Sequence, residues 1–225
     1  MAMPWIYAGR RWVATRDLQL LRYPEKSAVA QPVTAGCYLS VYWLTEGRHA
    51  EHLRWTVGIN QRLNRDGRVH EGRTHVFTAF QDHAATVYRD GAAGPRDHHA
   101  LDHPYAGLVV EVIDSESPEQ REELLAWLRS RHLPGRLAGS PAAMVTVFRP
   151  TPLPADRMAY VKQVEGVGTR LTLLWFLERD PRECWEGYFT GLDTDVISAG
   201  PGHVEFVAPF IPTIRGTDHY VDRLR

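Results

Sequence analysis

The chain lacks the features that mark secreted and nucleic-acid-binding proteins. It contains only 2 cysteines, Cys37 and Cys184, which are too few for a disulfide framework. Its 26 basic and 27 acidic side chains give a net charge of −1, without the basic excess typical of nucleic-acid binders. We therefore expect an intracellular protein, cytoplasmic by default, that has no nucleic-acid partner.

Long apolar runs and nucleotide-binding motifs are missing as well. No apolar stretch approaches the roughly 20 residues that span a bilayer, and residues 1–5 lack the charged head and apolar middle of a signal peptide. There is no G-x-G-x-x-G after a strand, no G-x-x-x-x-G-K-[ST] and no G-x-S-x-G. We expect no membrane partner and no cofactor, and nucleotide-dependent and serine-hydrolase chemistry are disfavoured.

What is present is the composition of a globular protein, with 44% hydrophobic and 24% charged residues. Runs rich in aromatic and β-branched residues predict buried strands at 37–44, 107–113 and 170–177. Each run leads into a helical stretch and then a returning strand, which gives strand–helix–strand units at about 37–80, 107–149 and 169–210.

Capping residues predict where two helices begin. In Ser117-Pro118-Glu119-Gln120 a serine N-cap is followed by proline at the first helical position and glutamine at the third. The segment 180–183 repeats this arrangement with Asp180 as the N-cap.

The first two units in series have the β-α-β-β-α-β order of a ferredoxin-like fold. The predicted fold class is therefore α+β: one ferredoxin-like unit over 37–149 plus a partial second copy, with an antiparallel sheet and helices on one face. The expected domains are an N-terminal extension (1–35), a first unit (36–150) with a long insertion (81–105), a linker (151–168) and a partial second unit (169–225).

Three segments are notable: the passage Leu174-Trp175-Phe176-Leu177-Glu178-Arg179-Asp180-Pro181, the aromatic helix around Trp185 and Tyr188, and the later Pro209-Phe210-Ile211-Pro212-Thr213. With them the chain resembles the dimeric α/β-barrel superfamily, most closely its EthD-like branch. The resemblance covers about a quarter of the chain. It implies a sheet whose concave face encloses a small apolar pocket. The superfamily includes cofactor-free monooxygenases, isomerases, cyclases and dehydratases, so the fold alone does not choose a function.

A histidine-rich segment at 97–105 is the most conspicuous group of titratable residues. Histidine titrates near neutral pH, and a neighbouring carboxylate can orient its ring for proton transfer. We predict that the insertion folds over the pocket and contributes His99, Asp102 or His103 as catalytic residues. An exposed loop without a function is the alternative. A metal site is a further alternative for this segment. We predict no metal site, because the segment has no known zinc-binding spacing.

Further candidates lie on the predicted helix and strands. His49 can face the pocket from the first helix or belong to a solvated helix surface. Glu205 and Glu111 are acids among apolar strand residues, which favours a general acid or base role. Alternation along the predicted strand places His203, Glu205 and Val207 on one face. The predicted substrate-binding aromatic residues are Tyr42, Tyr105, Trp175 and Tyr188.

These observations favour a cofactor-independent acid–base enzyme, a lyase, dehydratase, isomerase or cyclase acting on a small hydrophobic or aromatic molecule. A cofactor-free monooxygenase of a phenolic substrate and a non-catalytic small-molecule-binding or stress protein are the alternatives. We also expect a homodimer or a fused pseudo-dimer, because an incomplete second copy leaves a sheet edge unpaired.

Overall fold

A computed structural model describes residues 6–11, 38–42, 47–68, 79–90, 105–153, 155, 157, 165–189 and 200–212. These residues form a 7-stranded sheet of order β2-β1-β7-β4-β6-β5-β3, in which all paired neighbours are antiparallel. The strands are β1 (Ile6–Arg11), β2 (Tyr38–Tyr42), β3 (Phe80–Tyr88), β4 (Gly107–Asp114), β5 (Ala142–Thr151), β6 (Leu171–Leu177) and β7 (His203–Pro212).

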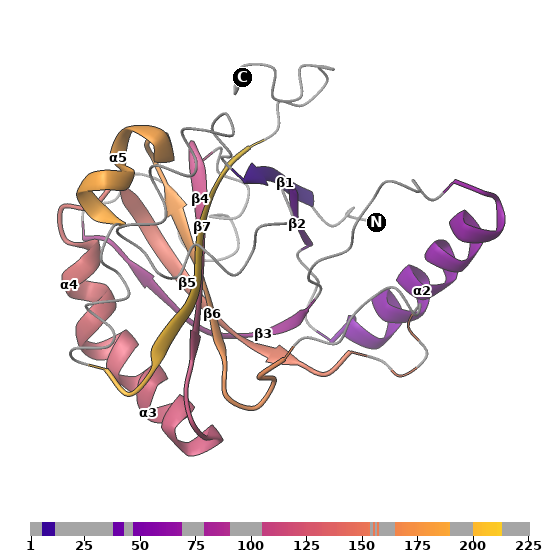
Figure 1. Cartoon of the computed structure of the whole chain (residues 1–225), viewed down its shortest axis with the longest axis horizontal. Helices are drawn as coiled ribbons and strands as arrows, with labels where there is room; N and C mark the ends of the chain where they lie inside the picture. The colour runs from indigo at the N-terminus through magenta and orange to yellow at the C-terminus, as the bar shows by residue number, and fades with distance from the viewer. Residues whose placement is uncertain are drawn as a thin grey trace.

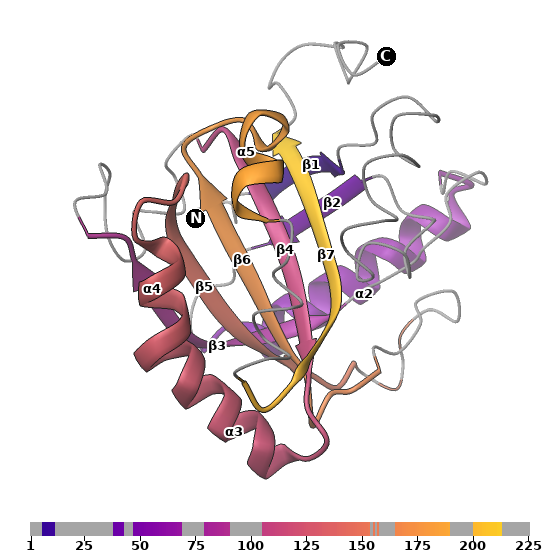
Figure 2. The same cartoon turned by 60° about the vertical axis from the view of Figure 1, so that its left-hand side comes forward.

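The helices lie on both sides of this sheet but pack differently. Helix α3 (Pro118–Trp127) continues through a π-helical turn, η3 (Leu128–His132), into α4 (Leu133–Leu137). Pro134, which has no N–H to donate, is the second residue of α4. Together with α5 (Pro181–Tyr188) they cover one face of the sheet, whereas α2 (His49–Arg65) stands apart on the other side (Figures 1 and 2). The α+β class with an antiparallel sheet and a helix-covered face confirms the predicted fold class.

The complete β-α-β-β-α-β unit occupies a different part of the chain from the one predicted. It runs from β4 through α3, β5, β6 and α5 to β7, and its strands are adjacent in the order β7-β4-β6-β5. The expected unit over 37–149 is wrong, because β2 and β3 lie at opposite edges of the sheet. The strand–helix–strand units look alike in sequence, and only the long-range register, such as Leu108 opposite Phe176, decides which of them combine.

The expected insertion at 81–105 also needs correction, because its first part is strand. Residues Phe80–Tyr88 form β3, which pairs with β5 from Phe80↔Thr151 to Tyr88↔Met144. This is an edge strand with several half-exposed residues, so its hydrophobic alternation is weak and the sequence alone suggested a loop. Residues 91–104, which hold most of the histidine-rich segment, lie outside the described residues.

Alternation along the central strands separates two apolar clusters, one on each face. The helix-covered face carries a core that includes Val109, Ile113, Leu173, Trp175 and Val207, against which α3, η3, α4 and α5 pack. The opposite face carries a second cluster of side chains that are at most 8% exposed. We call this face the helix-free face, because α2 stands apart on that side and contributes no residue to this cluster. The members of the cluster include Tyr105, Leu108, Val110, Val112, Leu174, Phe176, Ala208 and Phe210.

Both predicted helix caps are present. The Ser117 hydroxyl accepts a hydrogen bond from the Gln120 N–H at 3.2 Å, and the Asp180 carboxylate accepts one from the Arg182 N–H at 2.9 Å. Burial alone would raise the pKa of Asp180, but the hydrogen bonds and charge of Arg182 hold that pKa below its usual value. Each helix therefore begins at the residue expected from the sequence.

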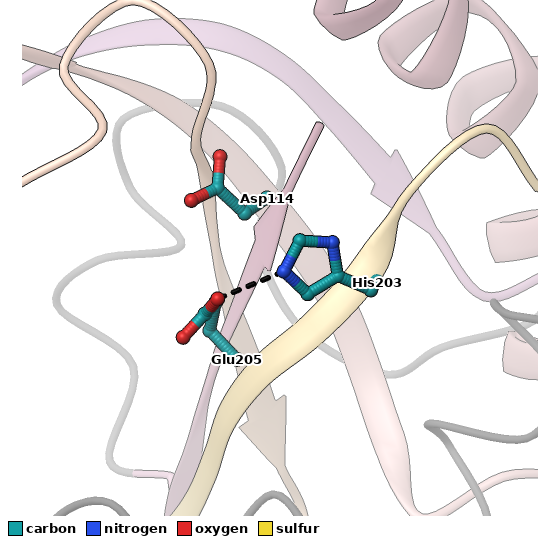
Figure 3. A group of neighbouring side chains, drawn as sticks. All are labelled: Asp114, His203 and Glu205. Atoms are coloured by element: carbon teal, nitrogen blue, oxygen red, sulfur yellow. Dashed lines mark hydrogen bonds and ion pairs between the residues drawn. The ribbon is translucent and has the colours of Figure 1, made fainter. Parts of the chain in front are cut away.

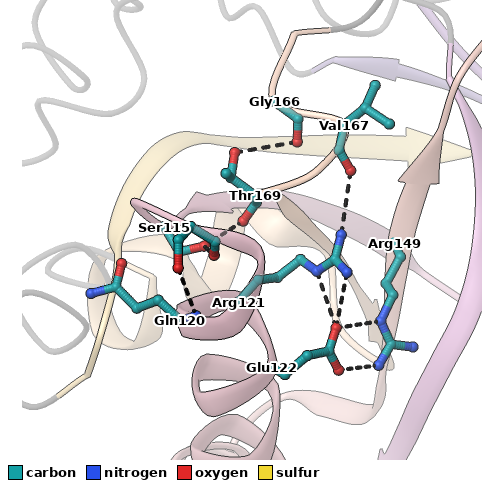
Figure 4. A network of polar contacts seen from close by, with 9 residues as sticks. Ser115, Gln120, Arg121, Glu122, Arg149, Gly166, Val167 and Thr169 are labelled. Carbon is teal, nitrogen blue, oxygen red and sulfur yellow. Dashed lines mark hydrogen bonds and ion pairs between the residues drawn. The ribbon is translucent and has the colours of Figure 1, made fainter.

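A polar network then fixes α3 against β5 and the turn before β6 (Figure 4). Glu122 accepts hydrogen bonds from Arg149 at 2.6 and 3.1 Å and from Arg121 at 3.0 and 3.2 Å. The Ser115 hydroxyl donates to the Thr169 carbonyl at 2.7 Å. These bonds hold the junction between β4, α3 and β6, next to the polar cluster described below.

Candidate functional site

The register of β4 and β7 gathers polar side chains where β4 ends and β7 begins. Asp114, the last residue of β4, is opposite His203, the first residue of β7. By alternation Asp114 shares the helix-free face with Val110 and Val112. A pair of directly opposed residues points to the same face, so His203 lies beside Asp114.

A β-bulge then brings Glu205 to the same place. The pairing shifts between Val112↔Phe206 and Ile113↔Val204, which leaves Glu205 as the extra residue of β7. Val207 accordingly lies in the core of the helix-covered face, while Glu205 contacts His203. The expectation that Glu205 shares a face with Val207 is wrong because of this bulge.

Four side chains therefore form what we call the strand-end cluster: Asp114, Arg170, His203 and Glu205. His203 Nε2 lies 2.8 Å from Glu205 Oε1 (Figure 3). Arg170 Nε donates to Asp114 Oδ2 at 2.8 Å, and another guanidinium nitrogen of Arg170 lies 3.8 Å from Glu205 Oε2. The Asp114 side chain is 14% exposed, that of Glu205 34% and that of His203 55%.

The charge state of Asp114 is set by these contacts. Burial by itself would raise the pKa of its carboxyl group. Hydrogen bonds from Thr169, Arg170 and the Ser115 N–H, together with the positive charge of Arg170, outweigh burial and hold that pKa below its ordinary value. Asp114 is thus a fixed negative charge at neutral pH, and Arg170 is its partner.

Chemically, the cluster joins an exposed imidazole to a carboxylate. A carboxylate only accepts hydrogen bonds, so an ionised Glu205 requires the hydrogen of a neutral His203 ring to be on Nε2. The other ring nitrogen, Nδ1, then carries the lone pair that can accept a proton. This arrangement can perform general acid–base chemistry. Among the described residues, Asp114, His203 and Glu205 are also close enough to one another to ligate one metal ion.

The second predicted acid, Glu111, lies in a different environment. It is fully buried on the helix-covered face, and its Oε2 accepts a 2.8 Å hydrogen bond from the indole nitrogen of Trp175. Trp175, predicted to bind substrate, is 1% exposed and packs edge-on against Phe189. Protein encloses both side chains, and we do not include them in the candidate site.

The remaining predicted aromatic residues lie away from the cluster. Tyr105 is buried on the helix-free face, with its ring 5.0 Å from that of Phe176. It precedes β4, whereas Asp114 ends this strand, so the length of β4, roughly 25 Å, separates the two residues. The Tyr188 hydroxyl donates to the Gly139 carbonyl at 2.9 Å and ties α5 to the connection before β5.

The other predicted site residues cannot be placed in a site. His99, Asp102 and His103 fall outside the described residues. His49 is the first residue of α2 and Tyr42 the last of β2, but the structure describes only their backbone. Of the residues predicted to be general acids or bases, Glu205 and Glu111 are thus the two whose side-chain contacts are defined, and Glu111 is enclosed in the core.

Sequence reasoning missed Asp114 and Arg170. Each is a charged residue at the end of an apolar strand, a position that normally indicates the boundary with solvent. The signal that could have found them is the antiparallel pairing of β4 with β6, whose register opposes Ile113 and Leu171 and so brings the residues just beyond them together. The local patterns place these two strands in different strand–helix–strand units and therefore do not predict their pairing.

Comparison with known proteins supports the fold. No protein-family model matches the sequence, and no curated protein matches it either. The structure is similar to the crystal structure of an anthrone oxidase-like protein, with a TM-score of 0.52 and 11% sequence identity over 93% of this chain and 91% of that one. In addition, no helix in the described part of the chain is long and apolar enough to cross a membrane. The chain thus shares with this protein an α+β fold, in which a ferredoxin-like β-α-β-β-α-β unit forms part of an antiparallel sheet.

Proposed function

We propose that the protein is a cofactor-independent acid–base enzyme acting on a small hydrophobic or aromatic molecule, and that His203 and Glu205 transfer the proton. The observation that carries the proposal is the 2.8 Å contact between His203 Nε2 and Glu205 Oε1 at the margin of the apolar helix-free face. Glu205 fixes the tautomer, and the His203 Nδ1 atom removes or returns a proton on a carbon next to a carbonyl group.

Two neighbours support these roles. Arg170 pairs with Asp114 and stands 3.8 Å from Glu205, so its positive charge lies next to both carboxyl groups and holds them beside His203. Val112 is buried on the same face two residues before Asp114, so the imidazole stands at the margin of an apolar cluster. His203, 55% exposed on its side chain, is accessible to a substrate.

Anthrone is a suitable probe, because removal of a proton from its methylene group gives an aromatic anion. The experiment follows deuterium incorporation at that methylene carbon by mass spectrometry under argon. The full-length protein should accelerate exchange, and His203→Ala and Glu205→Gln should each reduce the acceleration by about 10²–10⁴-fold. His83→Ala is the matched control, since His83 is also an exposed strand histidine, hydrogen-bonded to Thr86 at 2.9 Å.

Exchange that stays at the buffer rate with wild-type protein over a panel of anthrone, tetralone and naphthol probes would contradict the proposal. Full activity in His203→Ala would contradict the assignment of the proton carrier.

The second candidate is a cofactor-free monooxygenase of a phenolic substrate, favoured by the structural similarity to the anthrone oxidase-like protein. The same His203 base would generate an electron-rich anion that reacts with molecular oxygen. In that case one anthrone and one O₂ would give one anthraquinone and one water, and an oxygen electrode would record uptake that depends on His203. Deuterium exchange without oxygen uptake above the uncatalysed rate would leave the acid–base enzyme as the function.

The proposal includes a homodimer. In the described residues β2 and β3 are the two edge strands, each paired on one side. Unpaired edges tend to be covered or paired in native proteins. Light scattering at micromolar concentration should give twice the mass of the 25.6 kDa chain, and a monomer mass would contradict this part of the proposal.

A further inference from the structure

The donor set of the strand-end cluster suits a divalent transition metal ion. Asp114, His203 and Glu205 each offer one ligand atom, and these atoms all lie within 4.8 Å of one another. An imidazole nitrogen with carboxylate oxygens is a combination that zinc and related ions bind in proteins. The three residues come from two adjacent strands whose register and bulge fix their positions.

We propose that Zn²⁺, or a divalent ion of the same class, binds Asp114, His203 and Glu205 and thereby switches off proton transfer. This regulatory inference rests on the proposed function, although the binding itself does not. Bonds of about 2.0–2.2 Å place the ligands of a tetrahedral zinc ion roughly 3.4 Å apart. The cluster therefore has to contract, and the partly exposed side chains of Glu205 and His203 can rotate to allow it.

Inhibition follows from the chemistry of the imidazole. Glu205 faces Nε2, so an ion that enters between the two side chains binds that nitrogen and displaces its hydrogen. The neutral ring has a single N–H hydrogen, so this hydrogen moves from Nε2 to Nδ1 when the ion binds Nε2. The lone pair that the proposed reaction uses is then lost.

Arg170 opposes the metal and limits its affinity. Its guanidinium lies 2.8 Å from Asp114 Oδ2 and 3.8 Å from Glu205 Oε2, so a cation that binds both carboxylates is repelled by it. The two carboxylates and the guanidinium together leave one negative charge beside a neutral His203. Binding is favourable because of this charge and is weakened by the guanidinium, as expected for a reversible inhibitory site.

The test uses the full-length protein after removal of metals with a chelator. Isothermal titration with Zn²⁺ measures affinity, and the visible absorption of Co²⁺ reports the coordination. His203→Ala and Asp114→Asn should each weaken Zn²⁺ binding by about 10–100-fold or more, His83→Ala should leave it unchanged, and Arg170→Gln should tighten it. Nitrogen-15 spectra of the histidine rings should show the His203 hydrogen moving to Nδ1 when Zn²⁺ is added.

Zn²⁺ binding that survives in His203→Ala, or that weakens in Arg170→Gln, would overturn the inference. Because these readouts need no substrate, they separate the two proposals. Zn²⁺ binding through His203 in a protein that exchanges no probe would leave the metal site standing and remove the proposed function. Exchange that depends on His203 but is insensitive to Zn²⁺ would leave the proposed function standing and remove the inhibitory metal site.

Discussion

The indole nitrogen of Trp175 donates a 2.8 Å hydrogen bond to Glu111 Oε2 within the core between the sheet and α5. Val109 and Trp175 are paired across β4 and β6, and Glu111 lies two residues further along β4 on the same face. A buried carboxylate is costly unless hydrogen bonds satisfy it. Trp175 therefore stabilises the fold as a hydrogen-bond donor as well as by its apolar area.

This relationship predicts energetic coupling between the two residues. Trp175→Phe keeps an aromatic ring but removes the donor of a hydrogen bond to a buried acceptor, which should cost about 1–3 kcal/mol in addition to lost packing. In a Glu111→Leu background the same substitution should cost less, since the acceptor of this hydrogen bond is gone. Urea unfolding of both single variants and the double variant measures this coupling, and strictly additive effects would contradict it.

The N-cap of α3 gives a second prediction. Ser117→Ala removes the hydroxyl that accepts from the Gln120 N–H, so the free energy of unfolding should fall by about 1 kcal/mol. Ser130→Ala is the matched control, because its exposed hydroxyl bonds the Ala126 carbonyl within the same helical segment and caps nothing. We expect the control to change stability by less than about 0.5 kcal/mol in the same urea experiment. Equal losses in the two variants would argue against the cap.

The sequence predicted the local elements better than their assembly. The capping residues Ser117 and Asp180 gave the starts of α3 and α5, because a cap acts within one helical turn. The assignment of strands to units failed, because the pairing of β4 with β6 and β7 joins residues that are far apart in the chain. Glu205 was predicted from its apolar neighbours, but its contact with His203 depends on a bulge that no local pattern reveals.

The ion pair of Asp114 with Arg170 predicts acid sensitivity. The pKa of Asp114 is lowered in the folded protein from an ordinary value of 3.8, so the folded state binds the proton less readily than the unfolded state. The resulting stabilisation is present above pH of about 4 and is lost as the pH falls through the lowered pKa. The stability difference between wild type and Asp114→Asn should therefore shrink below pH 4.

Thermal unfolding between pH 7 and pH 2.5 measures this effect. Glu116→Gln provides a control, since Glu116 is exposed and neighbours the same strand end. The gap between wild type and Asp114→Asn should close in acid, whereas the control should follow wild type throughout. A gap that stays constant with pH would show that Asp114 does not stabilise the fold through its charge.

Tyr105 predicts the opposite response in alkali. Burial, followed by the negative charges of Glu178 and Tyr88, raises the pKa of Tyr105 from 10.0 to about 12. Above pH 10 this tyrosine ionises in the unfolded chain but not in the folded one, so the unfolded state is favoured as the pH rises from 10 to 12. The Tyr105→Phe variant, which retains the ring packed on Phe176, should lose this part of the alkaline destabilisation. Absorbance at about 295 nm, where tyrosinate absorbs, should show one phenol fewer titrating near pH 12 in the variant. If the phenol that disappears is one that titrates near 10, Tyr105 is accessible to solvent and its place in the buried cluster of the helix-free face is wrong.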